Sequence, residues 1–310
     1  MRYLIVGFGN IGHKRAKVLG KKLVATVDPK QETKADYSDS KDVPLVIFKT
    51  AVLTVPQQIK YELTEYFLSK GKNVLVEKPL IITPKQGRHL LGLSKKTGAV
   101  WHTSYNHRFE PNIIKFRKLV QSKFLGKIYH GQVVYSFGNI KERIGTWRET
   151  EFGVLEEIAP HLIDFAISFL GYKGKDFMPF IAQKNEAKIF DHFVFLTSDK
   201  KIILETSSVT WKYQFLLEIF GSKGSLHLQG LRKWGGSKLI KRARILPSGA
   251  PKEEIIEDFG PDLTWEKDFK YFEKQVRGRN NSLRNDLEVS LALAKIAGGV
   301  NKIYEEILKG

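Results

Sequence analysis

Hydrophobic and polar positions in the first hundred residues form short apolar runs separated by longer amphipathic segments. The apolar runs predict buried strands at 2–6, 22–27, 51–55, 73–76 and 99–103. Segments with helical spacing follow at 11–19, 57–70 and 84–96. The stretch 31–50 is polar and then apolar from Val43, so we expect a short strand and a short helix there. Strands that alternate with helices are typical of an α/β domain.

A different pattern begins near Asn106. A helical segment and a run of strand-like segments follow, at 111–121, 128–135, 177–182, 190–197, 201–209, 214–220 and 225–228. Helices are predicted at 262–276 and 286–308, and a core-facing stripe in the second is indicated by the spacing of Leu287, Leu291, Ala294 and Ala297. This pattern predicts an α+β domain with an open, mostly antiparallel sheet. We therefore expect two domains, at 1–105 and 106–310.

A glycine motif, Gly7-Phe8-Gly9-Asn10-Ile11-Gly12, lies between the first strand and the first helix. In the Rossmann fingerprint the first glycine permits a tight turn, the second lets the backbone approach a pyrophosphate, and the third lets helix and strand pack closely. Asp28 follows the second strand, where a carboxylate can bind the ribose hydroxyls and repel a 2′-phosphate. The motif predicts a dinucleotide site that favours NAD over NADP, although Lys30 is close by in the sequence.

A second motif follows the fourth predicted strand. Residues 73–76 are Asn-Val-Leu-Val, apolar after the first residue and with two β-branched valines, and Glu77 and Lys78 stand between them and Pro79. Ligands of open parallel sheets bind at the carboxyl ends of the strands, so this lysine is expected where cofactor and substrate meet. Taken alone, Glu77 and Lys78 could equally be interpreted as an ion pair on the protein surface.

Composition narrows the function classes. The sequence contains no cysteine, which excludes disulfides, thiolate metal ligands and cysteine nucleophiles. The eight histidines show no metal-ligand spacing, so we predict no metal site. No apolar run is long enough for a membrane span, and the sequence begins with a strand rather than a signal peptide, from which we expect a cytoplasmic protein and no membrane partner.

The formal net charge of +18 would attract anionic ligands. No nucleic-acid motif is found, and the densest basic run, 232–244, is better interpreted as a solvated loop and edge strand, so we expect no nucleic-acid partner. An anionic small molecule such as a nucleotide sugar fits the charge, and so does a general preference for lysine.

Motifs along nearly the full chain resemble those of the Gfo/Idh/MocA family of nicotinamide-dependent oxidoreductases. They occur in family order at residues 7–12, 77–79, 105–109, 153–155, 161–164 and 221–225, followed by the terminal helical region. The resemblance implies a catalytic lysine, a histidine and a carboxylate four residues before it, which here are Lys78, His161 and Glu157. It also implies a homo-oligomer, a dimer or tetramer, that associates through the free face of the second sheet.

The implied chemistry is consistent with the residue types. Oxidation of a secondary alcohol requires a base for the hydroxyl proton, a role that suits His161, and Lys78 can stabilise the developing alkoxide. Glu157, His161 and Asp164 are spaced i, i+4 and i+7, as on one helical face. Pro160 lacks a backbone donor, so the helix can begin as late as Pro160, and Glu157 then lies outside it.

The remaining site residues are expectations of the same kind. Contacts with the cofactor are expected from Gly7, Phe8, Gly9, Asn10, Ile11, Gly12, Asp28, Thr54, Pro56, Glu77 and Lys78. Contacts with substrate are expected from Tyr105, Arg108, Trp147, Arg148 and Asp164, since arginine can bind an anion bidentately and tryptophan can cover a sugar face. For these residues, a purely structural role in packing at the domain junction is as well supported by the sequence as contact with substrate.

The sequence thus favours an NAD-dependent oxidoreductase that acts on a hydroxyl or ketone of a sugar, sugar derivative or nucleotide sugar. A non-catalytic nicotinamide-binding regulator is one alternative. A hydrolase or lyase that oxidises its substrate transiently with bound NAD is another.

Overall fold

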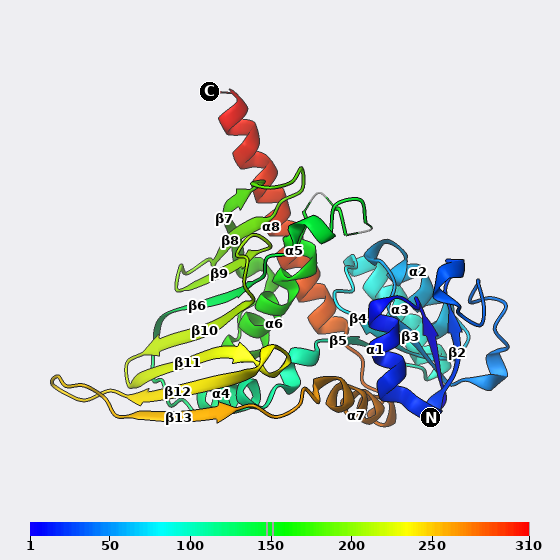
Figure 1. The fold of residues 1–310 in the computed structure, drawn as a ribbon, viewed down its shortest axis with the longest axis horizontal. Coiled ribbons are helices and arrows are strands. Elements are labelled where there is room, and N and C mark those ends of the chain that lie inside the picture. The colour runs from blue at the N-terminus through cyan, green and yellow to red at the C-terminus, as the bar shows by residue number, and fades with distance from the viewer. Residues whose placement is uncertain (147, 151, 310) are drawn as a thin grey trace. The chain divides into compact units, whose positions relative to one another are not determined.

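The computed structural model describes residues 1–146, 148–150 and 152–309 (Figure 1). It describes the burial of side chains up to residue 300. Two compact units make up the fold. The first comprises Met1–Asn106 and Thr264–Ser290, and the second comprises His107–Leu263 and Leu291–Gly310. Among the described residues, no helix combines the length and the hydropathy that a membrane crossing requires.

The first unit is built on a five-stranded parallel sheet with the order β2-β1-β3-β4-β5. Its strands are β1 (Tyr3–Val6), β2 (Leu23–Val27), β3 (Thr50–Leu53), β4 (Asn73–Glu77) and β5 (Trp101–Ser104). The helices of this unit are α1 (Asn10–Leu19), α2 (Gln57–Ser69), α3 (Pro84–Thr97), α7 (Thr264–Gly278) and the beginning of α8 (Leu283–Lys309). The Rossmann-type sheet predicted from the alternating pattern is confirmed.

Alternate residues of β1 enter two separate cores, as the period of a strand requires. Tyr3 and Ile5 pack with Phe269 and Phe272 of α7. Leu4 and Val6 belong to the other cluster, which contains Phe67 of α2. Because both faces are covered, every residue of β1 is buried, which explains why it reads as a continuous apolar run rather than an alternating one.

The stretch 31–50 differs from the expectation. It contains two short 3₁₀ helices, Gln31–Thr33 and Leu45–Ile47, and no strand before β3. Phe48 is buried, but Val46 is 84% exposed, so the apolar run does not enter the sheet as a unit. The carbonyls of Leu45 and Phe48 accept hydrogen bonds from the Lys72 ammonium at 2.6 and 3.1 Å. A side chain therefore satisfies backbone groups that a strand would have paired in a ladder.

The second unit contains an eight-stranded sheet with the order β13-β12-β11-β10-β6-β9-β8-β7. The strands are β6 (Ile128–Ser136), β7 (Phe177–Gln183), β8 (His192–Thr197), β9 (Ile202–Ser207), β10 (Gln214–Gly221), β11 (Gly224–Leu231), β12 (Gly236–Ala243) and β13 (Glu253–Asp258). All neighbouring strands are antiparallel except β6 and β9. The open, mostly antiparallel sheet predicted from the sequence is confirmed.

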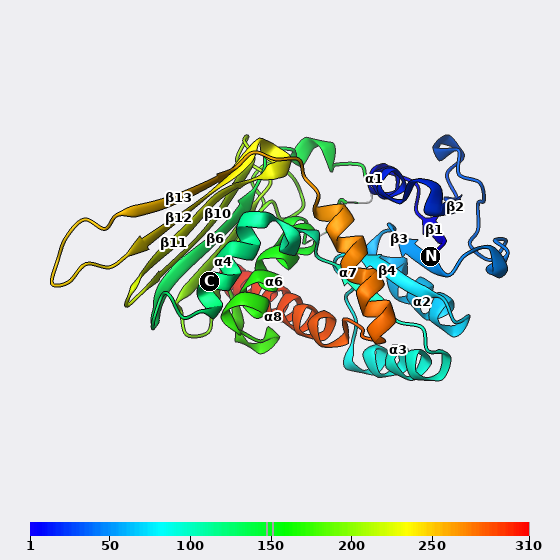
Figure 2. The ribbon, with the colours of Figure 1, turned by 90° about the horizontal axis from the view of Figure 1, so that it is seen from below.

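Helices cover one face of this sheet. They are α4 (Pro111–Gln121), α5 (Val154–Glu157) and α6 (Ala159–Leu170), and Figure 2 shows α4 and α6 on the same side of the strands. Val133, Leu204 and Leu217 are buried on the covered face. On the other face a row of residues crosses all eight strands in register: Met178, Leu196, Ile203, Gln132, Glu218, His227, Ile240 and Ile255. Met178, Ile203 and Ile255 in this row are exposed.

The basic run at 232–244 lies largely on β12, beside the edge strand β13, which the sequence reading missed. Carboxylates of β13 stand opposite these basic residues: Lys241 binds Glu254 at 2.7 Å and Arg242 binds Glu253 at 2.6 Å. Opposite charges in directly facing positions stabilise a strand pair. The run is therefore an ion-paired hairpin.

The core stripe expected on the last helix is wrong. Leu291 is 45% exposed, whereas Val289, Leu293, Ile296 and Val300 are buried. The helix belongs to the first unit up to Ser290 and to the second from Leu291. The buried residues Asp286, Val289, Leu293, Ile296 and Val300 still follow one helical spacing, so α8 has a buried stripe, but on a different side of the helix from the predicted one.

A buried guanidinium connects four elements of the first unit. Arg15 of α1 has no exposed side-chain surface and binds Glu77 of β4, Ser104 of β5 and Asp268 of α7. Its Cζ atom lies 4.4 Å from the ring centre of Trp265. Burial disfavours the charge, but the two carboxylates outweigh burial and raise the pKa of Arg15.

We expect Asp268→Asn to lower the free energy of unfolding by about 3 kcal/mol, because it removes one of two carboxylates that compensate a buried charge. Urea unfolding checks this, with Glu65→Gln as the control. Glu65 pairs with His89 on the surface, where the loss of an ion pair has little effect. Equal midpoints for the two variants would contradict the expectation.

Candidate functional site

The three glycines of the loop differ in their steric surroundings. Gly7 has φ of +89°, and a Cβ there would lie 2.6 Å from the carbonyl oxygen of Thr54. A Cβ on Gly12 would overlap the carbonyl oxygen of Gly7. At Gly9 a Cβ would meet no protein atom within 4 Å. The first and third glycines are therefore required by packing, whereas the second leaves the backbone open to close approach by another group.

The N-terminus of α1 follows this loop directly. Gly9 is its N-cap residue, no side chain caps the helix, and its first turn contains no acidic residue. Free N–H groups and the helix dipole favour a phosphate at such an end. The loop and helix end therefore fit a dinucleotide pyrophosphate, which Gly9, Asn10, Ile11 and Gly12 would bind through their backbone.

Asp28 stands immediately after β2 and is tied to the same loop. Its carboxylate accepts a hydrogen bond from the N–H of Phe8 at 2.7 Å and another from the N–H of Lys30 at 3.0 Å. Thr54 supports the loop from β3, since its hydroxyl donates to the Gly7 carbonyl. Pro56 caps the start of α2. The predicted cofactor residues Phe8, Asp28 and Thr54 are thus joined around one loop.

Glu77 and Lys78 follow the same carboxyl edge of the parallel sheet. Glu77 is the last residue of β4 and binds Arg15, so its carboxylate serves the ion network. Lys78 is half-buried and comes next, before Pro79. We name residues 77–79 the lysine turn. The carbonyls of all three residues accept hydrogen bonds from the ammonium of Lys60.

His161 belongs to the second unit and lies in the first turn of α6. It is 5% exposed, and its ring centre lies 4.3 Å from that of His107 and 5.7 Å from that of Tyr135. The helix preceding it, α5, ends at Glu157, and α6 begins at Ala159 with Pro160 in its first turn. Glu157 and His161 therefore belong to two helices rather than to one helical face.

The predicted carboxylates Glu157 and Asp164 are both ion-paired with arginines. Glu157 binds Arg143, and its other oxygen lies 3.7 Å from Arg148. Asp164 is buried and accepts two hydrogen bonds from the Arg108 guanidinium, one of them at 2.7 Å. Tyr105 is buried in the first unit. Trp147, the remaining candidate for substrate contact, lies outside the described residues.

The sequence reading missed several buried polar residues. In the second unit, the Tyr135 hydroxyl accepts a hydrogen bond of 2.6 Å from Lys233, and burial raises the pKa of Tyr135. His107 Nε2 lies 3.3 Å from the same hydroxyl. In the first unit, the sequence does indicate that Lys60 is buried, because its position has helical spacing to Phe67 and Leu68. The buried residues of α2 are Lys60, Thr64, Phe67 and Leu68.

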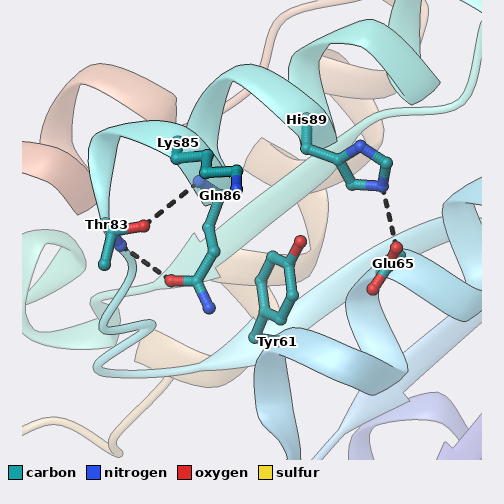
Figure 3. A pocket seen from close by; sticks show the side chains of 6 residues that line it. All are labelled: Tyr61, Glu65, Thr83, Lys85, Gln86 and His89. Carbon is teal, nitrogen blue, oxygen red and sulfur yellow. Dashed lines mark hydrogen bonds and ion pairs between the residues drawn. The ribbon is translucent and has the colours of Figure 1, made fainter.

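A hollow lies between α2 and α3 of the first unit, and Figure 3 shows its lining. The side chains there already bind one another. Thr83 and Gln86 form a capping box at the start of α3, and His89 binds Glu65 at 2.8 Å. The hollow is therefore a gap between helices with satisfied polar groups. Within the described part of the chain, no cluster of three or more acidic or histidine side chains could hold a metal ion.

Two family profiles match the sequence. Residues 1–105 match the oxidoreductase family with an NAD-binding Rossmann fold, and residues 113–227 match the Gfo/Idh/MocA C-terminal domain. The uncharacterised oxidoreductase YdgJ of Escherichia coli is 26% identical over 68% of this chain and 60% of its own length. The scyllo-inositol 2-dehydrogenase (NADP(+)) IolW of Bacillus subtilis is 26% identical over 53% of this chain and 48% of its own length. The matched region thus spans less than two thirds of either relative.

The fold has close counterparts among solved structures. A levoglucosan dehydrogenase in complex with NADH superposes with a TM-score of 0.79 at 14% identity, over 97% of each chain. At that identity the likeness establishes the fold alone. The glycine loop, the sheet order and the two successive profile matches agree with one another, and the chain belongs to the Gfo/Idh/MocA family of oxidoreductases, with an NAD-binding Rossmann domain at its start.

Proposed function

We propose that this protein is an NAD(P)-dependent oxidoreductase that transfers hydride between nicotinamide and a hydroxyl or ketone of a sugar, sugar derivative or nucleotide sugar. The observation that carries the proposal is the position of Lys78. It follows β4 at the same edge of the parallel sheet as the glycine loop that follows β1. An amine at this edge can interact with the reacting end of a dinucleotide whose pyrophosphate is bound at α1.

The reaction separates one C–H and one O–H bond of the alcohol. The bound nicotinamide would supply the acceptor for hydride, and this chain would supply the groups that handle the proton. We assign the base to the His161 imidazole and the stabilisation of alkoxide charge to the Lys78 ammonium. Glu157 would support the site through Arg143 and Arg148, to which it is ion-paired. In this proposal residues 1–105 bind the cofactor and residues 106–310 bind the substrate.

The substrate class follows from relatives and from the charge pairs of the second unit. IolW acts on an inositol and the solved neighbour acts on levoglucosan, as their names state. Arg108 and Arg148, which could have bound an anionic group, each face a carboxylate. A neutral polyhydroxy ring is therefore favoured over a phosphate-bearing one. Tyr105, Asp164 and Trp147 remain the proposed substrate contacts.

The cofactor preference rests on Asp28. Its carboxylate is anchored by two backbone N–H groups, so it remains fixed at the end of β2 where the adenosine ribose would lie. A fixed negative charge disfavours a 2′-phosphate, which supports NAD over NADP.

Two other functions use the same fold. A nicotinamide-binding regulator would bind the cofactor without turnover, and a hydrolase or lyase with transient oxidation would form product with no net cofactor reduction. The support of the lysine turn by Lys60 favours a catalytic role over that of a regulator.

We also propose that the protein forms a homo-oligomer through the uncovered face of the eight-stranded sheet, where Ile203 is 45% exposed in the same cross-strand row as the exposed Met178. Light scattering after size exclusion checks this. We expect Ile203→Glu to lower the molar mass, because a charge on the paired face would be buried without a partner. Ile59→Glu, at an exposed apolar position of α2, should leave it unchanged. A wild-type monomer would refute the proposal.

For the catalytic role, we expect Lys78→Ala to lower kcat by about a hundredfold or more, because it removes the cation that stabilises the alkoxide. The assay follows absorbance of reduced nicotinamide with NAD and NADP against inositols, sugars, sugar acids and nucleotide sugars. Lys85→Ala, on α3, is the control. Unchanged turnover in Lys78→Ala would reject the mechanism, and product without a change of absorbance would favour transient oxidation.

For the cofactor, we expect Asp28→Asn to shift the ratio of NADP to NAD affinity by about tenfold towards NADP, since the amide keeps an acceptor for Phe8 and loses the charge. Titration calorimetry with each cofactor measures the ratio. Asp39→Asn is matched, because Asp39 binds the N–H of Lys41 as Asp28 binds that of Lys30. A ratio that moves equally in both variants would refute the role of Asp28.

A further inference from the structure

Lys60 is a buried cation with an unusual set of partners. It projects from α2, is 4% exposed, and its Nζ atom lies 2.7 Å from the carbonyl oxygen of Glu77, 3.1 Å from that of Lys78 and 2.9 Å from that of Pro79. Three consecutive carbonyls thus converge on one ammonium group. These are the three residues of the lysine turn.

The number of donors matches the number of acceptors. A protonated lysine has three N–H bonds and no acceptor, so each carbonyl can receive one hydrogen. A neutral amine has two, and one buried carbonyl would then lose its donor from this group. The turn begins at the last residue of β4, where the ladder of the sheet ends. A side chain therefore takes over the support of the backbone where the strand stops.

We propose that Lys60 is a positioning residue for Lys78: its ammonium group holds the backbone of the lysine turn and thereby fixes the direction in which the Lys78 side chain leaves the sheet. The catalytic consequence rests on the proposed function, whereas the structural one does not. Lys60 itself acts through Lys78, since its ammonium group donates to the backbone carbonyls of the lysine turn.

The charges around Lys60 make the support dependent on pH. Burial, and then the positive charge of Lys78, lower the pKa of Lys60 from 10.5 to about 7, while Glu77 opposes the shift. Above that pH the amine has one donor fewer than the carbonyls need. Glu77 and Lys78 are the charged groups that the structure identifies as acting on Lys60.

A second buried lysine provides a matched control. Lys72 lies in the same unit, is 8% exposed and donates to the carbonyls of Leu45 and Phe48 at 2.6 and 3.1 Å. It therefore shares the chemistry of Lys60, but the backbone that it supports is the loop before β3. A general effect of removing a buried cation would be the same in both variants, and a positioning effect would not.

The first experiment compares hydrogen–deuterium exchange in Lys60→Met, Lys60→Gln and Lys72→Met. We expect exchange in peptides covering 77–82 to rise about tenfold in Lys60→Met, because the turn opens locally when its donors are removed. Lys72→Met should instead raise exchange at 45–49. Lys60→Gln, which keeps two N–H bonds, should lie between wild type and Lys60→Met, and it serves alone if Lys60→Met does not fold. Unchanged exchange at 77–82 would overturn the proposal.

The second readout is steady-state kinetics with whichever polyol the wild-type protein oxidises. We expect kcat of Lys60→Met to fall about tenfold to a hundredfold with little change in the KM for NAD, because a misplaced Lys78 affects the reacting oxygen rather than cofactor binding. A kcat equal to that of Lys72→Met would overturn the proposal while Lys78→Ala still tests the enzyme. If wild type has no turnover, the proposed function fails, and the exchange result alone decides the role of Lys60.

The third readout is the pH dependence of unfolding. Between pH 7 and 10 the unfolded chain holds the Lys60 proton and the folded chain has released it, so the free energy of unfolding should rise with pH. We expect this slope to be smaller in Lys60→Met than in wild type. Identical slopes would show that Lys60 keeps its proton throughout, and would overturn the dependence of the support on pH.

Discussion

The buried charge of Arg15 is the constraint on which the first unit depends. A guanidinium without contact to water is stable only if its carboxylates are held beside it, and here they come from β4 and from α7, some 190 residues later in the chain. Two kinds of interaction therefore hold helix α7 in the first unit: the apolar contacts of Phe269 and Phe272, and the ion pair of Asp268 with Arg15. The same network holds Glu77, and with it the residue before Lys78.

A second buried cation completes this arrangement. Arg15 holds the Glu77 side chain, and Lys60 holds the backbone that follows it. The segment that presents Lys78 is thus fixed on both sides by charges that do not themselves reach solvent. In the proposed reaction, such support from surrounding residues would keep the geometry of Lys78 constant during turnover.

Local patterns were sufficient to predict the strands and helices around the glycine loop and the lysine turn. Short apolar runs, glycine spacing and Pro79 are signals that do not depend on distant residues. Partners that lie far apart in sequence gave no such signal: the pairing of Asp268 with Arg15, of Asp164 with Arg108, and of Glu157 with Arg143. The exposed Leu291 was mispredicted for a related reason, since two sides of this helix carry apolar residues at helical spacing, and only contacts with distant residues decide which side is buried.

Both edge strands of the eight-stranded sheet are unsuited to further strand pairing. At one edge, β13 carries Glu253, Glu254 and Glu257, charged side chains that are already ion-paired with cations of β12 and would lose water if another strand were added. At the other, β7 contains Pro179, which has no N–H to offer, and its register shifts at that point. Edges of this kind resist the open-ended stacking that leads to fibres. A sheet protected in this way can expose apolar residues on its face and still associate into assemblies of limited size.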